Sequence, residues 1–188
     1  MANTELQDKI SEASNQFVKA ITVDNFKELS DKVIENCVDN LIVGVNGHAV
    51  AFWLPEQKAG EDVLTIAYNV GDKGPDVEGV ISQPLDKGLV SKSFTEKTTV
   101  CHQGFFKHRD QSSSVDKELG QITAHQIASP FQLFGETVGA ITVIQTIRAG
   151  LEQNSEWGFD DNDVQHFEED VQVVQRLFEL NVIRQLQG

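Results

Sequence analysis

The chain has 188 residues, of which 39% are hydrophobic and 23% charged, as expected for one globular domain with terminal helices. A formal net charge of −14 argues against non-specific binding to nucleic acids and against docking on anionic membranes, because both require a basic surface. The longest apolar run, residues 49–54, is far shorter than the ~20 residues of a membrane span. Two cysteines make no disulfide framework and the N-terminal residues do not resemble a secretory signal, so we expect a cytoplasmic protein.

Helices are predicted at both ends of the chain. Residues 4–21 and 25–43 repeat apolar residues at spacings of three and four, a pattern typical of amphipathic helices. Thr22 or Asp24 would cap the second of these, and Cys37 lies on its apolar stripe, where a buried thiol is expected. A third helix is predicted over 161–186, with Asp160 or Asp161 as its cap. The single domain 1–188 thus divides into N-terminal helices (1–44), a sheet with its loops (45–146) and a C-terminal helix (160–187).

Strands are predicted in the middle of the chain. Residues 48–54 and 63–68 alternate as two strands, with 55–62 as the hairpin loop between them. The glycine-rich stretch 69–79 is predicted as loop, 87–97 as a short helix after Asp86, and 98–101 as a strand. Residues 103–120 are predicted as a long loop with one helical turn at 113–119. We expect this loop to be the most mobile internal segment, and long loops in compact domains are often functional.

A second hairpin is predicted from the alternation of residues 127–133 and 138–144. Gly135 and Glu136 supply the turn, and Ile127 and Phe131 share one face of the first strand. Pro130 predicts an edge or bulge position, because proline cannot donate a backbone hydrogen bond. Gly139 predicts that something packs closely against the second strand, where a side chain would not fit.

The segment SPFQLFGETVGAITVIQ, which includes this hairpin, resembles the closing hairpin of GAF domains, a family of sensory and regulatory modules. The segment PLDKGLVSKSFTEKTTVC resembles the family's short helix and following strand. Gly88, Leu89, Val90 and Phe94 match that pattern, whereas Ser91 stands where the family has a second glycine. The resemblance implies an α+β sandwich: a central antiparallel sheet with the terminal helices on one face and a ligand-sized cavity on the other.

Candidate pocket residues follow from this resemblance and from the long loop. Aromatic side chains with a few polar groups are what a small-molecule pocket needs, and the loop lies where GAF domains build the lid of their cavity. The phenylalanines of the loop, Phe105 and Phe106, could equally seal the core beneath it. The candidates are Cys101, Phe105, Phe106, His108, Arg109 and Phe131.

Three more specific chemistries receive little support. Cys101 followed by His102 resembles the attachment site of bilin-binding GAF domains, but lies some twenty residues too early. The same pair with His108 could ligate a metal, yet no fourth ligand is near, so we expect none. One GAF branch reduces free methionine sulfoxide, which needs two thiols within bonding reach. Cys37 is expected to be buried, so we predict no catalytic residue, no enzymatic activity and no cofactor.

The sequence therefore predicts a sensory or regulatory module that binds an unidentified small molecule and signals to a protein partner through its terminal helices. The alternative is a dimerisation or scaffold module whose core is filled by side chains. A second alternative is a thiol-based redox enzyme related to the free methionine sulfoxide reductases. The apolar stripes of the terminal helices also predict a homodimer. The residues expected at that interface are Phe17, Phe167, Val171, Val174 and Phe178.

Overall fold

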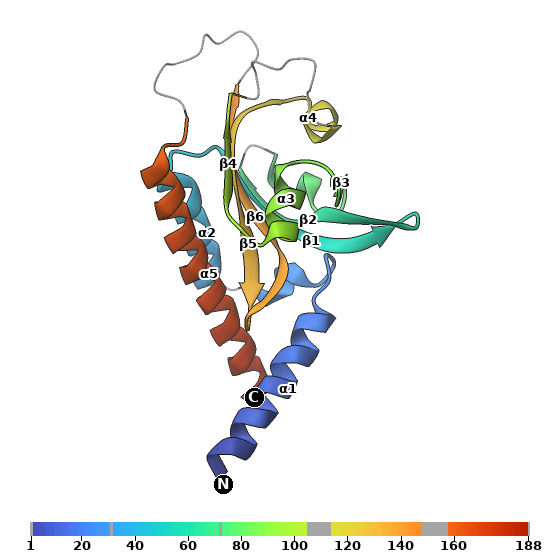
Figure 1. Cartoon of the computed structure of the whole chain (residues 1–188), viewed down its shortest axis with the longest axis vertical. Helices are drawn as coiled ribbons and strands as arrows, with labels where there is room; N and C mark the ends of the chain where they lie inside the picture. Colours follow the sequence, from blue (N-terminus) through green and yellow to red (C-terminus); the bar gives the residue numbers. More distant parts are fainter. Residues whose placement is uncertain (1, 31, 72, 105–113, 148–157, 188) are drawn as a thin grey trace.

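A six-stranded antiparallel sheet forms the centre of the molecule, with strand order β3-β2-β1-β6-β5-β4 (Figure 1). The structure is a computed structural model and describes residues 2–30, 32–71, 73–104, 114–147 and 158–187. The strands are β1 (Ala49–Lys58), β2 (Glu61–Gly71), β3 (Ser82–Pro84), β4 (Val100–Gln103), β5 (Ile122–Leu133) and β6 (Glu136–Ile147). The predicted α+β class with an antiparallel sheet is confirmed.

Helices cover both faces of the sheet. On one face α2 (Lys32–Val43) and α5 (Asp161–Gln187) lie side by side, and on the other lies α3 (Leu89–Glu96) (Figure 1). The remaining helices are α1 (Ala2–Ala20), α4 (Ser114–Leu119) and the 3-10 turns η1 (Phe26–Leu29) and η2 (Gly74–Val77). The beginning of α1 and the end of α5 lie toward the same end of the molecule (Figure 1). None of the helices in the described ranges combines the length and apolarity that crossing a bilayer requires.

Both hairpins close with two-residue turns. Ala59 and Gly60 have φ of 52° and 85°, and Phe134 and Gly135 have φ of 54° and 83°. Positive φ at both central residues is the geometry of tight turns that match the right-handed twist of the strands. The predicted loop over 55–62 is therefore wrong. Strands β1 and β2 stay paired as far as Lys58↔Glu61, and the turn needs only two residues.

The predicted helix over 25–43 is in fact two elements. Ser30 has extended backbone (φ −84°, ψ 143°), which separates η1 from α2. Upstream, Thr22 and Asn25 exchange side-chain hydrogen bonds with each other's backbone N–H, which fixes a turn before η1. The break lets Phe26 enter the core from a different direction than the stripe of α2, so tertiary packing overrides the helical pattern.

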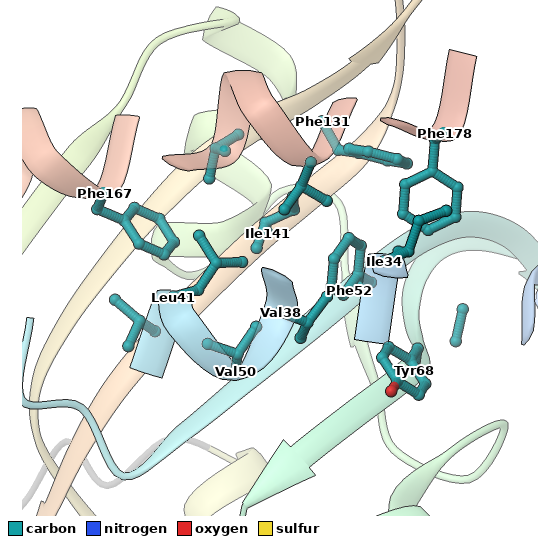
Figure 2. Packing of buried hydrophobic residues seen from close by; sticks show 14 of the residues in the cluster. Ile34, Val38, Leu41, Val50, Phe52, Tyr68, Phe131, Ile141, Phe167 and Phe178 are labelled. Carbon is teal, nitrogen blue, oxygen red and sulfur yellow. The ribbon is translucent and has the colours of Figure 1, made fainter. Parts of the chain in front are cut away.

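An aromatic cluster fills the space between the sheet and the terminal helices. Phe26 lies against Phe52, Phe131 and Phe178, with ring centroids 5.4, 5.9 and 5.2 Å away. All four side chains are fully buried. Phe26 belongs to η1, and Figure 2 labels the other three, Phe52 of β1, Phe131 of β5 and Phe178 of α5, so this cluster joins the helices to the sheet. Aromatic pairs at such distances stabilise a fold by ~0.5–1.5 kcal/mol beyond area burial.

The apolar stripe of α5 lies within this core. Phe167, Val171, Val174 and Phe178 are at most 1% exposed, because this stripe packs on the sheet and on α2. They offer no free surface to a second copy of the chain, so the prediction that they form a dimer interface is corrected. Phe17 on α1 is half-buried. The outward face of α5 carries Val173 and Leu180, which are 51% and 62% exposed.

The beginning of α5 has the cap that the sequence predicts. The Asp160 carboxylate accepts the N–H groups of Asn162 and Asp163 at 2.8 and 2.9 Å, and the Asp163 carboxylate accepts the N–H of Asp160 at 2.9 Å. These bonds lower the pKa of Asp160. A reciprocal cap of this kind satisfies N–H groups that have no partner within the helix.

Candidate functional site

The two faces of the sheet are packed differently. The helix face holds the aromatic cluster, whereas the α3 face holds a second, separate apolar cluster that is built around Trp53 and has no buried phenylalanine. The buried members of this second cluster are Ala51, Trp53, Leu64, Ile66, Val77, Ile81, Val90 and Ala140. Because side chains alternate along a strand, the residue pairing assigns each position to one face.

Small side chains occupy the centre of the α3 face. Ala51, Thr142 and Ala128 are cross-strand neighbours on β1, β6 and β5. The indole N–H of Trp53 donates to the hydroxyl of Thr142 at 3.1 Å, which fixes the indole ring in this layer. On α3, the hydroxyl of Ser93 is fully buried and has no hydrogen-bond partner among the described residues. The small residues let α3 approach the sheet closely.

One row further along the strands, the α3 face is only half covered. Ala49, Ile144, Gln126 and His102 are cross-strand neighbours on β1, β6, β5 and β4, and each is half-buried. We call these four residues the His102 row. It combines an imidazole and a primary amide with two apolar side chains, the mixture expected of a small-molecule site. The connection from β4 to α4 starts beside His102 and includes residues 105–113, which lie outside the described residues.

Four of the predicted pocket residues cannot be placed, and two are placed on the opposite face. Phe105, Phe106, His108 and Arg109 lie outside the described residues. Cys101 pairs with Ile127, and both join the core under the helices, as does Phe131. Cys101 and Phe131 thus lie on the helix face of the sheet, not on the opposite face, where the cavity is expected. Strand alternation points them toward α5, while the neighbouring His102 points toward α3.

Both cysteines are free thiols, and both are half-buried rather than one being fully buried as predicted. Burial raises the pKa of the Cys101 thiol, and the carboxylates of Asp163 and Asp161 raise it further. A thiol in such surroundings is a poor nucleophile, since the thiolate is the reactive form. Within the described ranges no group of three or more His, Cys, Asp or Glu side chains could hold a metal ion.

His125, which carries no motif in the sequence, has a structural role. It is 6% exposed, and its Nδ1 accepts the backbone N–H of Gly104 at 3.3 Å. Nearby, the amide of Gln103 donates to the carbonyl of Phe159, and the N–H of Gly158 donates to Gln145 at 3.0 Å. These contacts fasten the entry of α5 to β4, β5 and β6.

His102 enters the sequence predictions only together with Cys101, as an attachment or metal motif, and Gln126 is not singled out there. The alternation in the second hairpin already carried part of the signal, because Gln126 precedes Ile127 and must face the other way. That His102 lies beside Gln126 follows only from the pairing of β4 with β5.

Comparison with known proteins gives similarity at the level of the fold. No protein-family model matches the chain, and no curated protein matches it significantly. Among solved structures, the GAF-B domain of DevS from Mycobacterium smegmatis is similar with a TM-score of 0.58 and 10% identity, over 83% of this chain and 97% of that one. The GAF domain/HD domain protein from Geobacter sulfurreducens is similar with a TM-score of 0.57 and 15% identity, over 82% and 95%.

An enzyme is also among the similar structures. The free methionine-R-sulfoxide reductase from Neisseria meningitidis, in complex with its substrate, has a TM-score of 0.55 and 18% identity, over 94% of this chain and 89% of that one. Identities this low carry the fold alone and no activity. The sheet order, the helices on its two faces and these similarities together show that the chain has a GAF-like fold.

Proposed function

We propose that this protein is a sensory or regulatory module that binds a small molecule at the His102 row on the α3 face of its sheet. The observation that carries the proposal is the contrast between the two faces. The helix face is filled by buried aromatic rings, whereas the His102 row stays half-buried beside small residues. The imidazole of His102 and the amide of Gln126 would orient the ligand, and Ile144 and Ala49 would provide apolar contact.

Occupancy would be transmitted through β5 and β6. Gln126 and Ile144 face α3, while their chain neighbours Ile127 and Val143 lie in the core under the helices. A shift of these strands would displace α5, because α5 packs on β5. A protein partner would then detect the new position of the terminal helices. A ligand shifts such an equilibrium only by its difference in affinity for the two arrangements.

Native mass spectrometry of freshly purified protein tests the proposal, because it reports a retained small molecule and the oligomeric state together. Any molecule released is then added back to wild type, to His102→Ala and to His166→Ala in a thermal-shift assay. His166 is an exposed histidine on α5 and serves as the matched control. The proposal expects stabilisation of wild type and of His166→Ala and its loss in His102→Ala. Equal stabilisation of all three proteins would place the ligand elsewhere.

A homodimer is part of the proposal, now through the outward face of α5 where Val173 and Leu180 are exposed. A dimerisation module that binds no ligand is the main competing function, favoured by the complete packing of the helix face. It predicts a dimer with no retained molecule and no thermal shift from any metabolite. The same mass spectrum therefore distinguishes the two functions.

A further inference from the structure

A surface groove of about 430 Å³ runs along the outer edge of β5, between α5 and the connection from α3 to β4. Its volume lies within the ~300–1,000 Å³ typical of small-molecule sites. Thr99 and Ser129, which line it, lie on the helix side of the sheet, because Ser129 pairs with Ile141 of the helix-face core. The groove is thus separate from the His102 row. We call it the β5-edge groove.

The groove exists because β4 is much shorter than β5 and leaves the last part of β5 without a neighbour on that side. Pairing between the two strands stops at Val100↔Ala128, and a hydroxyl contact of 3.0 Å between Thr99 and Ser129 closes that end. Before β4, Lys97 ends α3 with a φ of 57°, so the chain reaches β4 from the direction of α3 and does not extend along β5. Beyond Ala128, the outer edge of β5 has no strand partner among the described residues.

Two opposite charges stand on opposite walls of the groove. The ammonium of Lys97 belongs to the α3–β4 connection and the carboxylate of Glu168 to α5. Neither has an ion-pair or hydrogen-bond partner within the described parts of the chain. In a chain with a net charge of −14, an unpaired cation across from an unpaired anion is matched by a ligand that carries both charges at its two ends.

The groups between the charges favour peptide bonds. Gln132, Gln172 and Gln175 line the groove, and each primary amide offers both a donor and an acceptor, as a peptide group does. Gln175 already demonstrates this pairing, because its Nε2 donates to the carbonyl of Pro130 at 3.1 Å. The side-chain carbonyl oxygen of Gln175 takes no part in that bond and can accept a peptide N–H.

We propose that the β5-edge groove binds a short peptide with free termini. Its carboxylate lies at Lys97, its ammonium at Glu168, and its peptide groups pair with the glutamine amides between them. A single amino acid does not suit the site, because its two charges are adjacent while those of the groove are on separate walls. Since α5 forms one wall, such a peptide would tie α5 to the α3–β4 connection.

Titration of ¹⁵N-labelled protein with trialanine, followed by ¹H–¹⁵N correlation spectra, tests the proposal. We expect saturable shifts in residues 97–99, 129–132 and 168–175. N-acetyl-trialanine amide, which has the same peptide groups without the terminal charges, should bind about nine- to 25-fold more weakly, since it loses both charge pairs and each exposed pair contributes about three- to fivefold.

Charge variants test whether trialanine binds in the β5-edge groove. Lys97→Gln and Glu168→Gln should each weaken trialanine binding by about three- to fivefold. Lys92→Gln on α3 and Glu169→Gln on α5 remove the same kinds of charge at nearby positions outside the groove and should leave binding unchanged. Absence of saturable shifts, equal binding of the blocked peptide, or equal loss in the control variants would each overturn the proposal. Shifts confined to the His102 row would also overturn it, while supporting a ligand site on the α3 face.

Discussion

Gly139 on β6 lies directly against the backbone of Trp53 on β1. A Cβ atom built on Gly139 would stand 2.1 Å from the carbonyl oxygen of Trp53 and 2.9 Å from Cδ2 of Leu54. The first of these contacts is with main chain, which cannot rotate away. Close packing at this glycine is what the sequence predicts, and the register Trp53↔Ala140 shows that β1 ends its pairing with β6 here.

Gly139→Ala should therefore destabilise the fold by about 3 kcal/mol or more, because the strands must separate to admit the methyl group. Urea unfolding measures the change. Gly60→Ala is the comparison: its Cβ would meet nothing within 4 Å, so only the cost of a positive φ remains, about 1–2 kcal/mol. A smaller effect at Gly139 than at Gly60 would contradict the contact with Trp53.

Phe178→Ala should cost about 3–5 kcal/mol of unfolding free energy, as expected for truncation of a fully buried phenylalanine. The same ring contacts Phe26, Phe52 and Phe131, so the cavity would lie at the junction of helices and sheet. Leu180→Ala, two residues away on the exposed side of α5, should change stability by less than about 0.5 kcal/mol. Similar costs for both variants would show that α5 is packed differently.

Leu180→Glu should convert a dimer to a monomer if the outward face of α5 is the interface, because a buried unpaired carboxylate opposes association. Analytical ultracentrifugation at tens of micromolar reads the outcome, with circular dichroism to show that α5 stays folded. Glu61→Gln, at the exposed tip of the β1–β2 hairpin, is the control. A wild-type monomer, or a dimer unaffected by Leu180→Glu, would show that the outward face of α5 is not a dimer interface.

Alkylation of Cys101 should respond to pH like a thiol with a raised pKa. Burial is the main cause, followed by Asp163 and Asp161, so the thiolate fraction at a given pH is lower than in a free thiol. In a Cys37→Ser variant, the iodoacetamide rate should reach its half-maximum at a higher pH than that of glutathione. A half-maximum at a lower pH would instead reveal an activated thiol and revive the redox enzyme.

Asp170→Asn should stabilise the protein at neutral pH. Burial raises the pKa of Asp170, against a smaller opposing effect of His166, so the folded protein binds more protons than the unfolded chain just above the ordinary value of 3.8. Stability is then lost as the pH rises through this window, and the ionised carboxylate is a net cost above it. Thermal melts should show the advantage of the variant at neutral pH and its disappearance below the ordinary value. A variant that is less stable at neutral pH would contradict this, and Asp24→Asn, at an exposed position, is the control.

Local patterns in the sequence were sufficient for the second hairpin and for α5. Alternation around Ile127 and Phe131 and the turn at Gly135 are properties of neighbouring residues, as is the cap at Asp160, so no distant contact is needed to predict them. Pro130 lies just beyond the last β4 pair and beside a bulge, at the kind of position that proline requires. The three-residue strand β3 escaped prediction because its residues 82–84 show no period of their own and are strand only by pairing with β2.

The α+β class, the order of most elements and the apolar stripe of α5 can all be predicted from the sequence, because short-range periodicity encodes which side of each element is apolar. Tertiary structure alone decided where those stripes pack. It placed Phe178 inside one subunit rather than at an interface, and it turned Cys101 toward α5 and His102 toward α3. A stripe records only that a surface must be covered, whereas strand register and helix placement, set by contacts distant in the chain, decide what covers it.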